Sequence, residues 1–242
     1  YPNMLDREYL TTIGQSDPKV EARANELIER GYKKLIAFET KEKGYEWFGG
    51  TPGHEALTAY GLMQFNDMKK VYSGVDQNMI DRTANWLMAS KDGKGGYKRN
   101  ARALDNFGGA SQNITDAYIT YALACANYEN IKIELDHLYE EAKSSKDAYV
   151  MGLAANALFA YHKDKRAASI LNELMKKQEA DGSFMGANHS ITRSTDKALR
   201  VETTSLAIMA MLQSDELKGE SLNKAVDYLT KARSGYGDFG NT

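Results

Sequence analysis

Apolar residues recur every three or four positions along most of this 242-residue chain, which is the period of an amphipathic helix. The clearest segment, residues 18–39, follows Asp17, a helix-capping residue type, and begins with Pro18, which is favourable in a first turn. Alternating β-branched runs of the kind that strands need are nearly absent. The pattern predicts helices at residues 3–13, 18–39, 54–70, 76–91, 113–128, 132–144, 147–162, 165–179, 200–213 and 219–233.

These helices are of two kinds that alternate along the chain. One kind is small and apolar on nearly every side and is expected to be covered by neighbours: EALTAYGLM at 55–63, DAYITYALAC at 116–125, AYVMGLAANA at 148–157 and ETTSLAIMAM at 202–211. The other kind, such as residues 132–144, has one apolar stripe and one charged face. Inner helices followed by outer helices close most simply into an α/α toroid, so residues 1–242 are predicted to be a single all-α domain. An open α-solenoid is the alternative.

A loop that pairs glycine with an aromatic residue also repeats, as GYEWFGG at 44–50, DGKGGY at 92–97, DGSF at 181–184 and GYGDF at 235–239. Glycine permits tight turns with positive φ, and we expect the ring to fill the gap between neighbouring inner helices at one rim. The first three loops lead into a predicted inner helix, whereas only residues 240–242 follow the fourth. We therefore expect a toroid that is incomplete at both ends.

Composition excludes several classes of function. Hydrophobic residues make up 42% and charged residues 26% of the chain, and the net charge of −2 offers no basic surface for nucleic acid or an anionic membrane. No segment approaches the roughly 20 apolar residues of a membrane span, so no direct membrane contact is expected. Four histidines and one cysteine occur without an HExxH or CxxC motif, which argues against a metal or a cofactor. Cys125, between two alanines in the middle of a predicted helix, is expected to be a small buried hydrophobe.

Four carboxylates, Glu55, Asp116, Asp147 and Glu202, fall at or near the first turns of predicted inner helices. Glycoside hydrolases on α/α toroids use two such groups across a sugar cleft, and Tyr45, Trp47 and Phe48 could stack on a sugar. A toroidal glycoside hydrolase or lyase is therefore an alternative. Acidic residues in first turns also stabilise the positive end of the helix dipole, and we predict that these four cap helices rather than cleave sugars.

Several segments together resemble the thioester domain of the alpha-2-macroglobulin and complement family, in its bacterial branch. The resemblance covers nearly the whole chain in order and is carried by YPN at 1–3, GY at 31–32, GYEWFG at 44–49, PGHEALTAYG at 52–61, DAYITYA at 116–122, VETTS at 201–205 and GYGDFG at 235–240. The domain of that family is an α/α toroid, which agrees with the fold predicted from the helical pattern.

The resemblance implies an endopeptidase inhibitor, not an enzyme, that traps a target protease covalently through an internal thioester between a cysteine and a glutamine three residues later. In the family this Cys-x-x-Gln lies shortly before the segment that resembles residues 1–3, and is therefore expected upstream of this chain. Cys125 is not a substitute, because Asn127 and Tyr128 follow it where a glutamine is required. The implied partners are the protease and neighbouring domains of the same polypeptide, and the implied location is extracytoplasmic: periplasmic, membrane-anchored or secreted.

Some complement members carry a histidine that takes over the acyl group and directs it to hydroxyls, but residues 92–112 of this chain contain none. Asn106, or alternatively Asp105, is nearest to that position, and members without the histidine resemble traps that react with amines. No catalytic residue is assigned. The residues expected to shield the acyl group are Tyr45, Trp47, Phe48, His54, Asn106 and Phe107. A protein-binding toroid that never carried a thioester is the remaining alternative.

Overall fold

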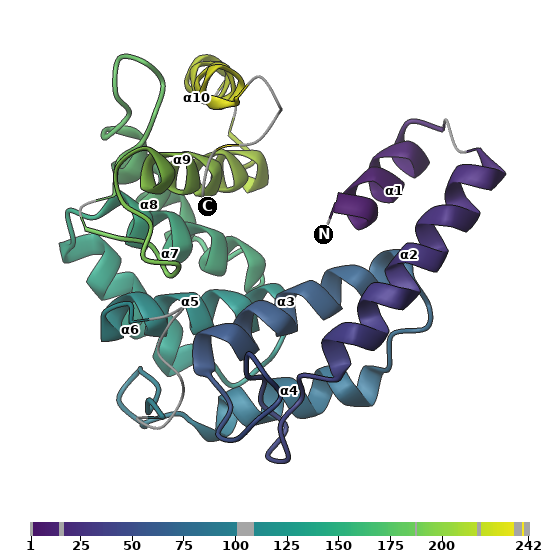
Figure 1. Cartoon of the computed structure of the whole chain (residues 1–242). Coiled ribbons are helices and arrows are strands. Elements are labelled where there is room, and N and C mark those ends of the chain that lie inside the picture. The colour runs from purple at the N-terminus through teal and green to yellow at the C-terminus, as the bar shows by residue number, and fades with distance from the viewer. Residues whose placement is uncertain are drawn as a thin grey trace. The chain divides into compact units, whose positions relative to one another are not determined.

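A computed structural model describes residues 2–14, 17–100, 109–186, 188–216, 219–234 and 239. They form α-helices and no named strand: α1 Pro2–Thr12, α2 Pro18–Ile36, α3 Glu55–Val71, α4 Gln77–Ala89, α5 Gln112–Cys125, α6 Lys132–Ser144, α7 Ala148–Ala160, α8 Arg166–Met175, α9 Asp196–Gln213 and α10 Gly219–Ala232 (Figure 1). Every predicted helix is present in order, and the prediction of an all-α fold is confirmed. The largest difference at a start is in α9, which begins at Asp196 rather than near residue 200.

Three aspartates fix helix starts in the same way. The side chains of Asp17, Asp76 and Asp147 each accept a hydrogen bond from the backbone N–H two residues later, at 2.7, 2.9 and 2.8 Å. Each bond satisfies a donor that has no partner within the helix, and each places a negative charge at the positive end of the helix dipole. The starts of α2, α4 and α7 are therefore determined by a residue that directly precedes each helix in the sequence.

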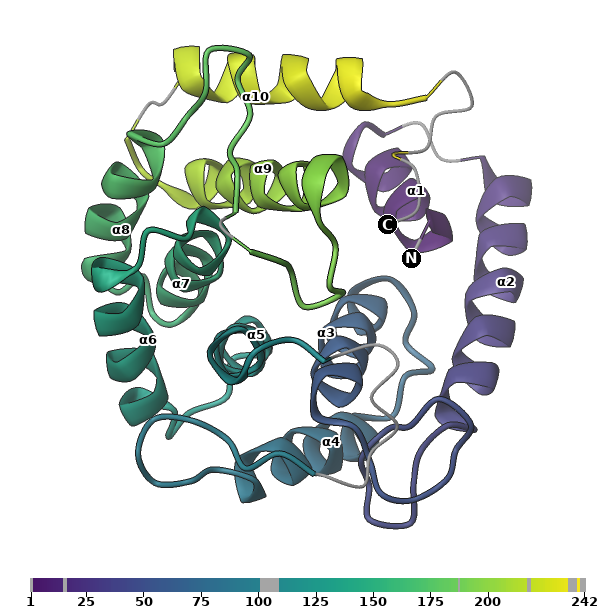
Figure 2. The ribbon, with the colours of Figure 1, turned by 60° about the vertical axis from the view of Figure 1, so that its left-hand side comes forward.

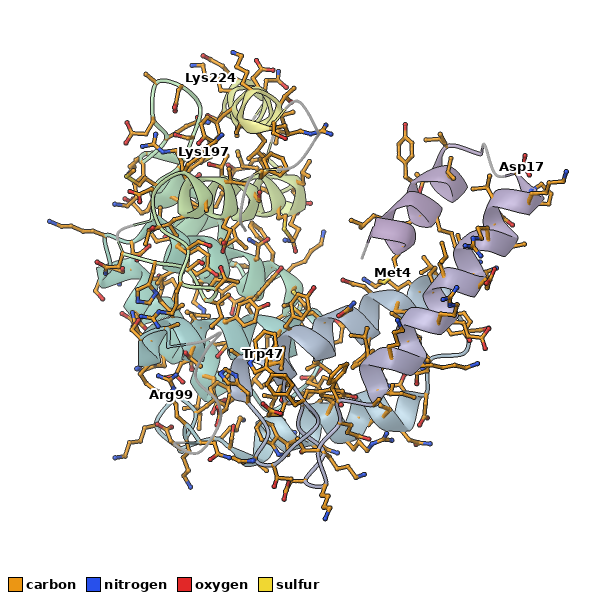
Figure 3. The ribbon with its side chains drawn as sticks, viewed as in Figure 1. Met4, Asp17, Trp47, Arg99, Lys197 and Lys224 are labelled. Atoms are coloured by element: carbon orange, nitrogen blue, oxygen red, sulfur yellow. The ribbon has the colours of Figure 1, made fainter. Side chains whose placement is uncertain are left out.

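The chain divides into two compact units, which we describe separately. Unit 1 comprises Tyr1–Ser90 with Lys98–Leu104, and unit 2 comprises Lys91–Tyr97 with Asp105–Thr242. In unit 1, α1 packs against α2 and α3, and α3 packs against α4. The ring of Tyr32 on α2 meets Phe65 of α3 edge-on at 6.0 Å between ring centroids. Met4 on α1, labelled in Figure 3, is buried.

Unit 2 has two layers of helices (Figure 2). The inner layer is α5, α7 and α9, in which α7 packs against both of the others, and α6, α8 and α10 cover it. Every residue of α7 from Ala148 to Leu158 is buried, whereas α6 buries only Glu134, Leu135, Leu138 and Ala142. This is the predicted alternation of inner and outer helices, and it is consistent with an α/α toroid. Closure into a ring, and the assignment of residues 1–242 to one domain, stay predictions.

A buried asparagine joins the two inner helices on which most of unit 2 packs. The amide nitrogen of Asn156 on α7 donates to the carbonyls of Gly152 and Leu206, each at 2.8 Å. Its amide oxygen accepts from the side chain of Gln213 at 2.6 Å. Because Asn156 is buried, its amide needs partners within the protein. These three hydrogen bonds fix the register of α9 along α7.

The three described glycine-aromatic loops share one backbone turn, which spans residues 40–45, 92–97 and 179–184. In each, the carbonyl of the fifth residue accepts from the N–H of the first: Gly44 from Thr40 at 2.7 Å, Gly96 from Asp92 at 3.0 Å and Ser183 from Glu179 at 2.8 Å. The fourth residue, Lys43, Gly95 or Gly182, has a positive φ in every case. At Gly182 a Cβ atom would also lie 2.1 Å from the carbonyl oxygen of Lys224, a residue of α10 labelled in Figure 3.

The sixth residue of this turn is the aromatic one, and its backbone docks on the inner helix that follows. The N–H of Tyr45 donates to the Thr58 hydroxyl at 2.8 Å, that of Tyr97 to the Asp116 carboxylate at 3.0 Å, and that of Phe184 to the Thr204 hydroxyl at 3.0 Å. All three rings are buried, and that they fill the gap between neighbouring inner helices stays a prediction. We name this arrangement the aromatic dock. The fourth predicted loop falls mostly at 235–238, outside the described residues.

We predict that Thr204→Val lowers the free energy of unfolding by about 1–3 kcal/mol, because valine has the shape of threonine but leaves the buried Phe184 N–H without an acceptor. Thr230→Val is the matched control. Both hydroxyls donate to the carbonyl four residues earlier, at 2.7 Å for Thr204 and 2.9 Å for Thr230, but Thr230 is exposed and accepts no loop N–H from the residues that the structure describes. Urea unfolding of the two variants measures the difference. Equal stabilities would show that the dock contributes nothing.

Candidate functional site: a pocket beside helix α3

Unit 1 contains a pocket of about 320 Å³ between the C-terminal part of α2, the first aromatic loop and α3. We call it the α3 pocket. It is lined by Leu35, Phe38, Tyr45, Glu46, Trp47, Leu57, Tyr60, Gly61, Gln64 and Phe65. Trp47, labelled in Figure 3, comes from the loop, and Tyr60 comes from the exposed side of α3. The walls are thus mostly apolar and aromatic, which is the usual character of a small-molecule pocket.

Tyr45 joins the pocket to the core. Its ring is 4% exposed and lies 5.4 Å from the Phe65 ring between centroids, and its N–H is held by the aromatic dock. Burial, followed by the negative charge of Glu39, raises the pKa of the Tyr45 hydroxyl above its ordinary value of 10.0. Tyr45 is therefore a neutral and fixed part of the wall across the physiological pH range.

Glu46 sets the course of the loop after Tyr45. Its carboxylate is buried, and Oε2 accepts from the backbone N–H groups of Phe48 at 2.8 Å and Gly50 at 3.2 Å. Between them, Gly49 has a φ of 71°, and a Cβ atom there would lie 3.0 Å from the carbonyl oxygen of Ala37. The other carboxylate oxygen, Oε1, is buried and has no hydrogen-bond partner among the residues that the structure describes.

The four carboxylates predicted to cap helices have different roles. Asp147 does cap α7, and Glu55 lies in the first turn of α3, where its side chain accepts from the N–H of Asn100. The capping prediction is wrong for Asp116 and Glu202. Asp116 is the fifth residue of α5 and holds Tyr97, whereas Glu202, well inside α9 because that helix starts early, accepts from the Thr192 hydroxyl at 2.9 Å. Three of the four, Glu55, Asp116 and Glu202, therefore fasten loops to helices.

Comparison with known proteins assigns the fold to a family. The family model described as the A-macroglobulin TED domain matches residues 1–242. The chain belongs to this TED domain family. A relative named thioester-containing protein 1 allele R1, from Anopheles gambiae, is 24% identical over 225 residues, covering 89% of this chain and 16% of that protein. The mouse alpha-2-macroglobulin-like protein 1 is 21% identical over 254 residues, covering 96% of this chain and 17% of that protein. The TED domain thus spans less than a fifth of the length of these relatives.

The α3 pocket of this TED domain includes two of the six residues predicted to shield a thioester. Tyr45 and Trp47 line it. Phe48 is 82% exposed and lies outside the lining, and His54 is buried as the N-cap of α3, where Nδ1 accepts from the Leu57 N–H at 3.3 Å. Asn106 and Phe107 lie outside the described residues. Whether these six residues surround a thioester stays a prediction.

Sequence reasoning missed Glu46 and Tyr60 as pocket residues. Glu46 lies between Tyr45 and Trp47, both already candidates, so an acidic residue flanked by two aromatic residues was an available signal. Tyr60 also gave a signal in the sequence, because it is a large aromatic residue with a polar hydroxyl among the small residues of α3, and it is 40% exposed. Phe38 gave no such signal, because only the end of α2 at Ile36 places it at the rim.

Cys125 of the TED domain is not the fully buried mid-helix residue that was predicted. It is the last residue of α5 and is partly exposed, because Asn127 takes a positive φ of 58° and the helix ends before it. In the described part of the chain, no group of three or more His, Cys, Asp or Glu side chains is placed to hold a metal ion. Likewise, none of the helices described here is long and apolar enough to cross a membrane.

Asp92 and Asp116 lie in or beside the second aromatic dock and have opposite electrostatic surroundings. The Asp92 carboxylate accepts from the N–H groups of Lys94 at 2.7 Å and Gly96 at 3.0 Å, which lowers its pKa from the ordinary value of 3.8. Asp116 is buried, and burial raises its pKa from 3.8 even though Oδ1 accepts from Tyr97 N–H and from the Gln112 side chain.

These opposite shifts predict opposite pH dependence for two Asp→Asn variants. A raised pKa stabilises the fold below the unfolded pKa near 3.8, and that stabilisation is lost as pH rises through the folded pKa. As the pH rises from about 3 to about 7, the stability of Asp116→Asn should therefore increase relative to that of the parent chain. A lowered pKa stabilises the fold above pH 3.8, and this stabilisation is lost on acidification. Asp92→Asn lacks it, so its stability relative to that of the parent chain should decrease over the same rise in pH. Urea unfolding at several pH values measures both slopes, and slopes of the same sign would contradict this account.

Proposed function

We propose that this TED domain belongs to a bacterial alpha-2-macroglobulin-like endopeptidase inhibitor that traps proteases covalently through an internal thioester. The observation that carries the proposal is the match of the A-macroglobulin TED model to all 242 residues. Two relatives named for a thioester and for alpha-2-macroglobulin support it, although this chain covers only 16% and 17% of them. The Cys-x-x-Gln itself is proposed to lie upstream in the longer protein, because Cys125 has no glutamine three residues later.

The proposed reaction needs no catalytic residue from this chain. A lysine amine of the protease attacks the thioester carbonyl, the C–S bond breaks, and the sulfur leaves as a thiolate that takes up the proton released by the amine. The product is an amide that joins glutamine to the protease. The protein must exclude water from the thioester until the protease reacts with it, and buried aromatic walls are suited to this role.

The wall proposed for this purpose consists of Tyr45, Trp47, Phe48, His54, Asn106 and Phe107. Support comes from Tyr45 and Trp47, which line one apolar pocket on a loop held by the aromatic dock. The absence of histidine from residues 92–112 supports a preference for amines over hydroxyls, because no imidazole is available there to accept the acyl group. Under this proposal the domain is not an enzyme.

The proposed setting is extracytoplasmic, whether periplasmic, membrane-anchored or secreted. The proposed partners are the target protease and neighbouring domains of the same polypeptide, and residues 1–242 are proposed to form one α/α toroid domain. A toroidal glycoside hydrolase or lyase has no observation in its favour, because Glu55, Asp116 and Glu202 are engaged in fastening loops. The other alternative, a protein-binding toroid without a thioester, would differ from the protease trap only in that it does not react covalently.

We predict that the 242-residue chain gains no covalent mass from methylamine or from an active protease, because it holds no acyl donor. The longer protein should take up one methylamine per chain and expose one new thiol. Intact-mass spectrometry and a thiol assay measure both changes. Replacement of the cysteine of the proposed Cys-x-x-Gln by alanine is the control, and it should abolish both.

The amine preference is tested with the same longer protein. Methylamine should compete with protease cross-linking at far lower concentration than glycerol does, because only the amine reacts readily without a histidine. Failure of the longer protein to take up methylamine would overturn the thioester proposal. Equal competition by glycerol would leave the thioester in place but contradict the proposed preference.

A further inference from the structure

The α3 pocket combines one buried acidic group with several aromatic rings. Its rings are those of Phe38, Tyr45, Trp47, Tyr60 and Phe65. Among the residues that line it in the described part of the chain, Glu46 is the one with a formal charge. A carboxylate in the wall of an ordinary apolar groove would not favour the binding of an apolar ligand, so these residues together indicate a different kind of ligand.

Glu46 has an unused acceptor. The carboxylate is only 4% exposed, and the two backbone N–H groups that hold it both donate to Oε2. Oε1 is buried without a partner among the described residues. A buried acceptor without a partner costs about 1–3 kcal/mol, and more when it is charged. A ligand that donates an N–H hydrogen bond from a positively charged group to Oε1 removes that cost, whereas a quaternary ammonium group, which has no N–H, only balances the charge of the carboxylate. An anion or an apolar group does neither.

The rings favour the same kind of ligand. Phe38 and Tyr60 stand at the rim of the pocket and are 39% and 40% exposed, and Trp47 is partly exposed. The face of an aromatic ring attracts a cation, and tryptophan does so most strongly. Rings around a carboxylate are a recurring solution for ammonium groups that carry methyl or methylene carbons, because the carbons contact the rings and the charge is balanced by the acid.

We propose that the α3 pocket binds an alkylammonium cation. The charged nitrogen faces Oε1 of Glu46, and the attached carbons lie against Trp47, Tyr60 and Phe38. A volume of about 320 Å³ admits a small head group rather than a large ligand. The cation can be a lysine side chain of a protein partner or a free quaternary amine, since both present a positive charge with attached carbons that contact the rings. The proposal concerns reversible binding to this chain and does not rest on the thioester.

Binding can be followed by an NMR titration of the 242-residue chain. The indole N–H signal of Trp47 reports on the pocket, and that of Trp86, which is outside the lining, is the internal reference. Choline and its neutral isostere 3,3-dimethylbutan-1-ol differ only in charge. We expect saturable shifts of the Trp47 signal with choline, and an affinity for the isostere that is weaker by about tenfold or more. Nα-acetyl-lysine methylamide, compared with choline, shows whether a lysine side chain or a quaternary amine fits better.

Two pairs of variants separate recognition from folding. Glu46→Gln keeps an oxygen for the loop N–H groups but removes the charge, so choline binding should weaken about tenfold while the isostere is unaffected. Glu42→Gln, an exposed change in the same loop, should leave both affinities unchanged. Tyr60→Leu should weaken choline binding about two- to fivefold, whereas Tyr9→Leu, on α1 and 64% exposed, should not.

Equal binding of choline and its isostere, or the same loss of both in Glu46→Gln, would overturn the proposal, because the pocket would then be merely apolar. The absence of any saturable shift at roughly 50 mM of each cation would overturn it as well. These outcomes are independent of the methylamine experiment, which tests covalent reactivity of the longer protein.

Discussion

The structure depends on one repeated interaction, the hydrogen bond from the backbone N–H of a loop aromatic residue to a side chain of the inner helix that follows. It occurs at Tyr45, Tyr97 and Phe184, with Thr58, Asp116 and Thr204 as the acceptors. Each bond fixes a ring that is buried, and a buried aromatic side chain contributes several times more than the bond does. The bond decides where the ring goes, and the ring supplies the stability. Both units of the chain use this device, in the loops that precede α3, α5 and α9.

The same device explains why a pocket arises at the first loop. After Tyr45, the Glu46 carboxylate turns the chain back by accepting from Phe48 and Gly50, and this directs Phe48 to solvent and leaves Trp47 beside α3. After Tyr97 and Phe184 the next residues are Lys98 and Met185, so neither of the other loops has an acidic residue directly after its aromatic residue. The pocket is thus a local addition to a repeated scaffold, as binding sites on loops commonly are.

Much of the fold could be predicted from the sequence because its signals are local. Asp17, Asp76 and Asp147 mark helix starts, and the small residues of 148–157 mark a helix covered on all sides. The docks could not be predicted, because the acceptor lies 13, 19 or 20 residues after the aromatic residue and only the path of the loop sets that spacing. Glu202 and Cys125 were misplaced for a related reason: each error follows from a helix end that differs by a few residues. In the candidate site, Tyr45 and Trp47 could be named from composition, but the outward position of Phe48 depends on the Glu46 carboxylate.

The most direct test of this account is native-state amide hydrogen exchange, measured by NMR, at the backbone N–H groups of Tyr45, Tyr97 and Phe184. These residues lie in loops, yet the docks predict that their amides exchange as slowly as those of buried residues in α3, α5 and α9, because opening them requires the ring to leave the core. The amide of Gly93, at the exposed tip of the second loop, should exchange rapidly. Rapid exchange at all three aromatic amides, at the rate found for Gly93, would contradict the claim that the docks hold the loops to the inner helices.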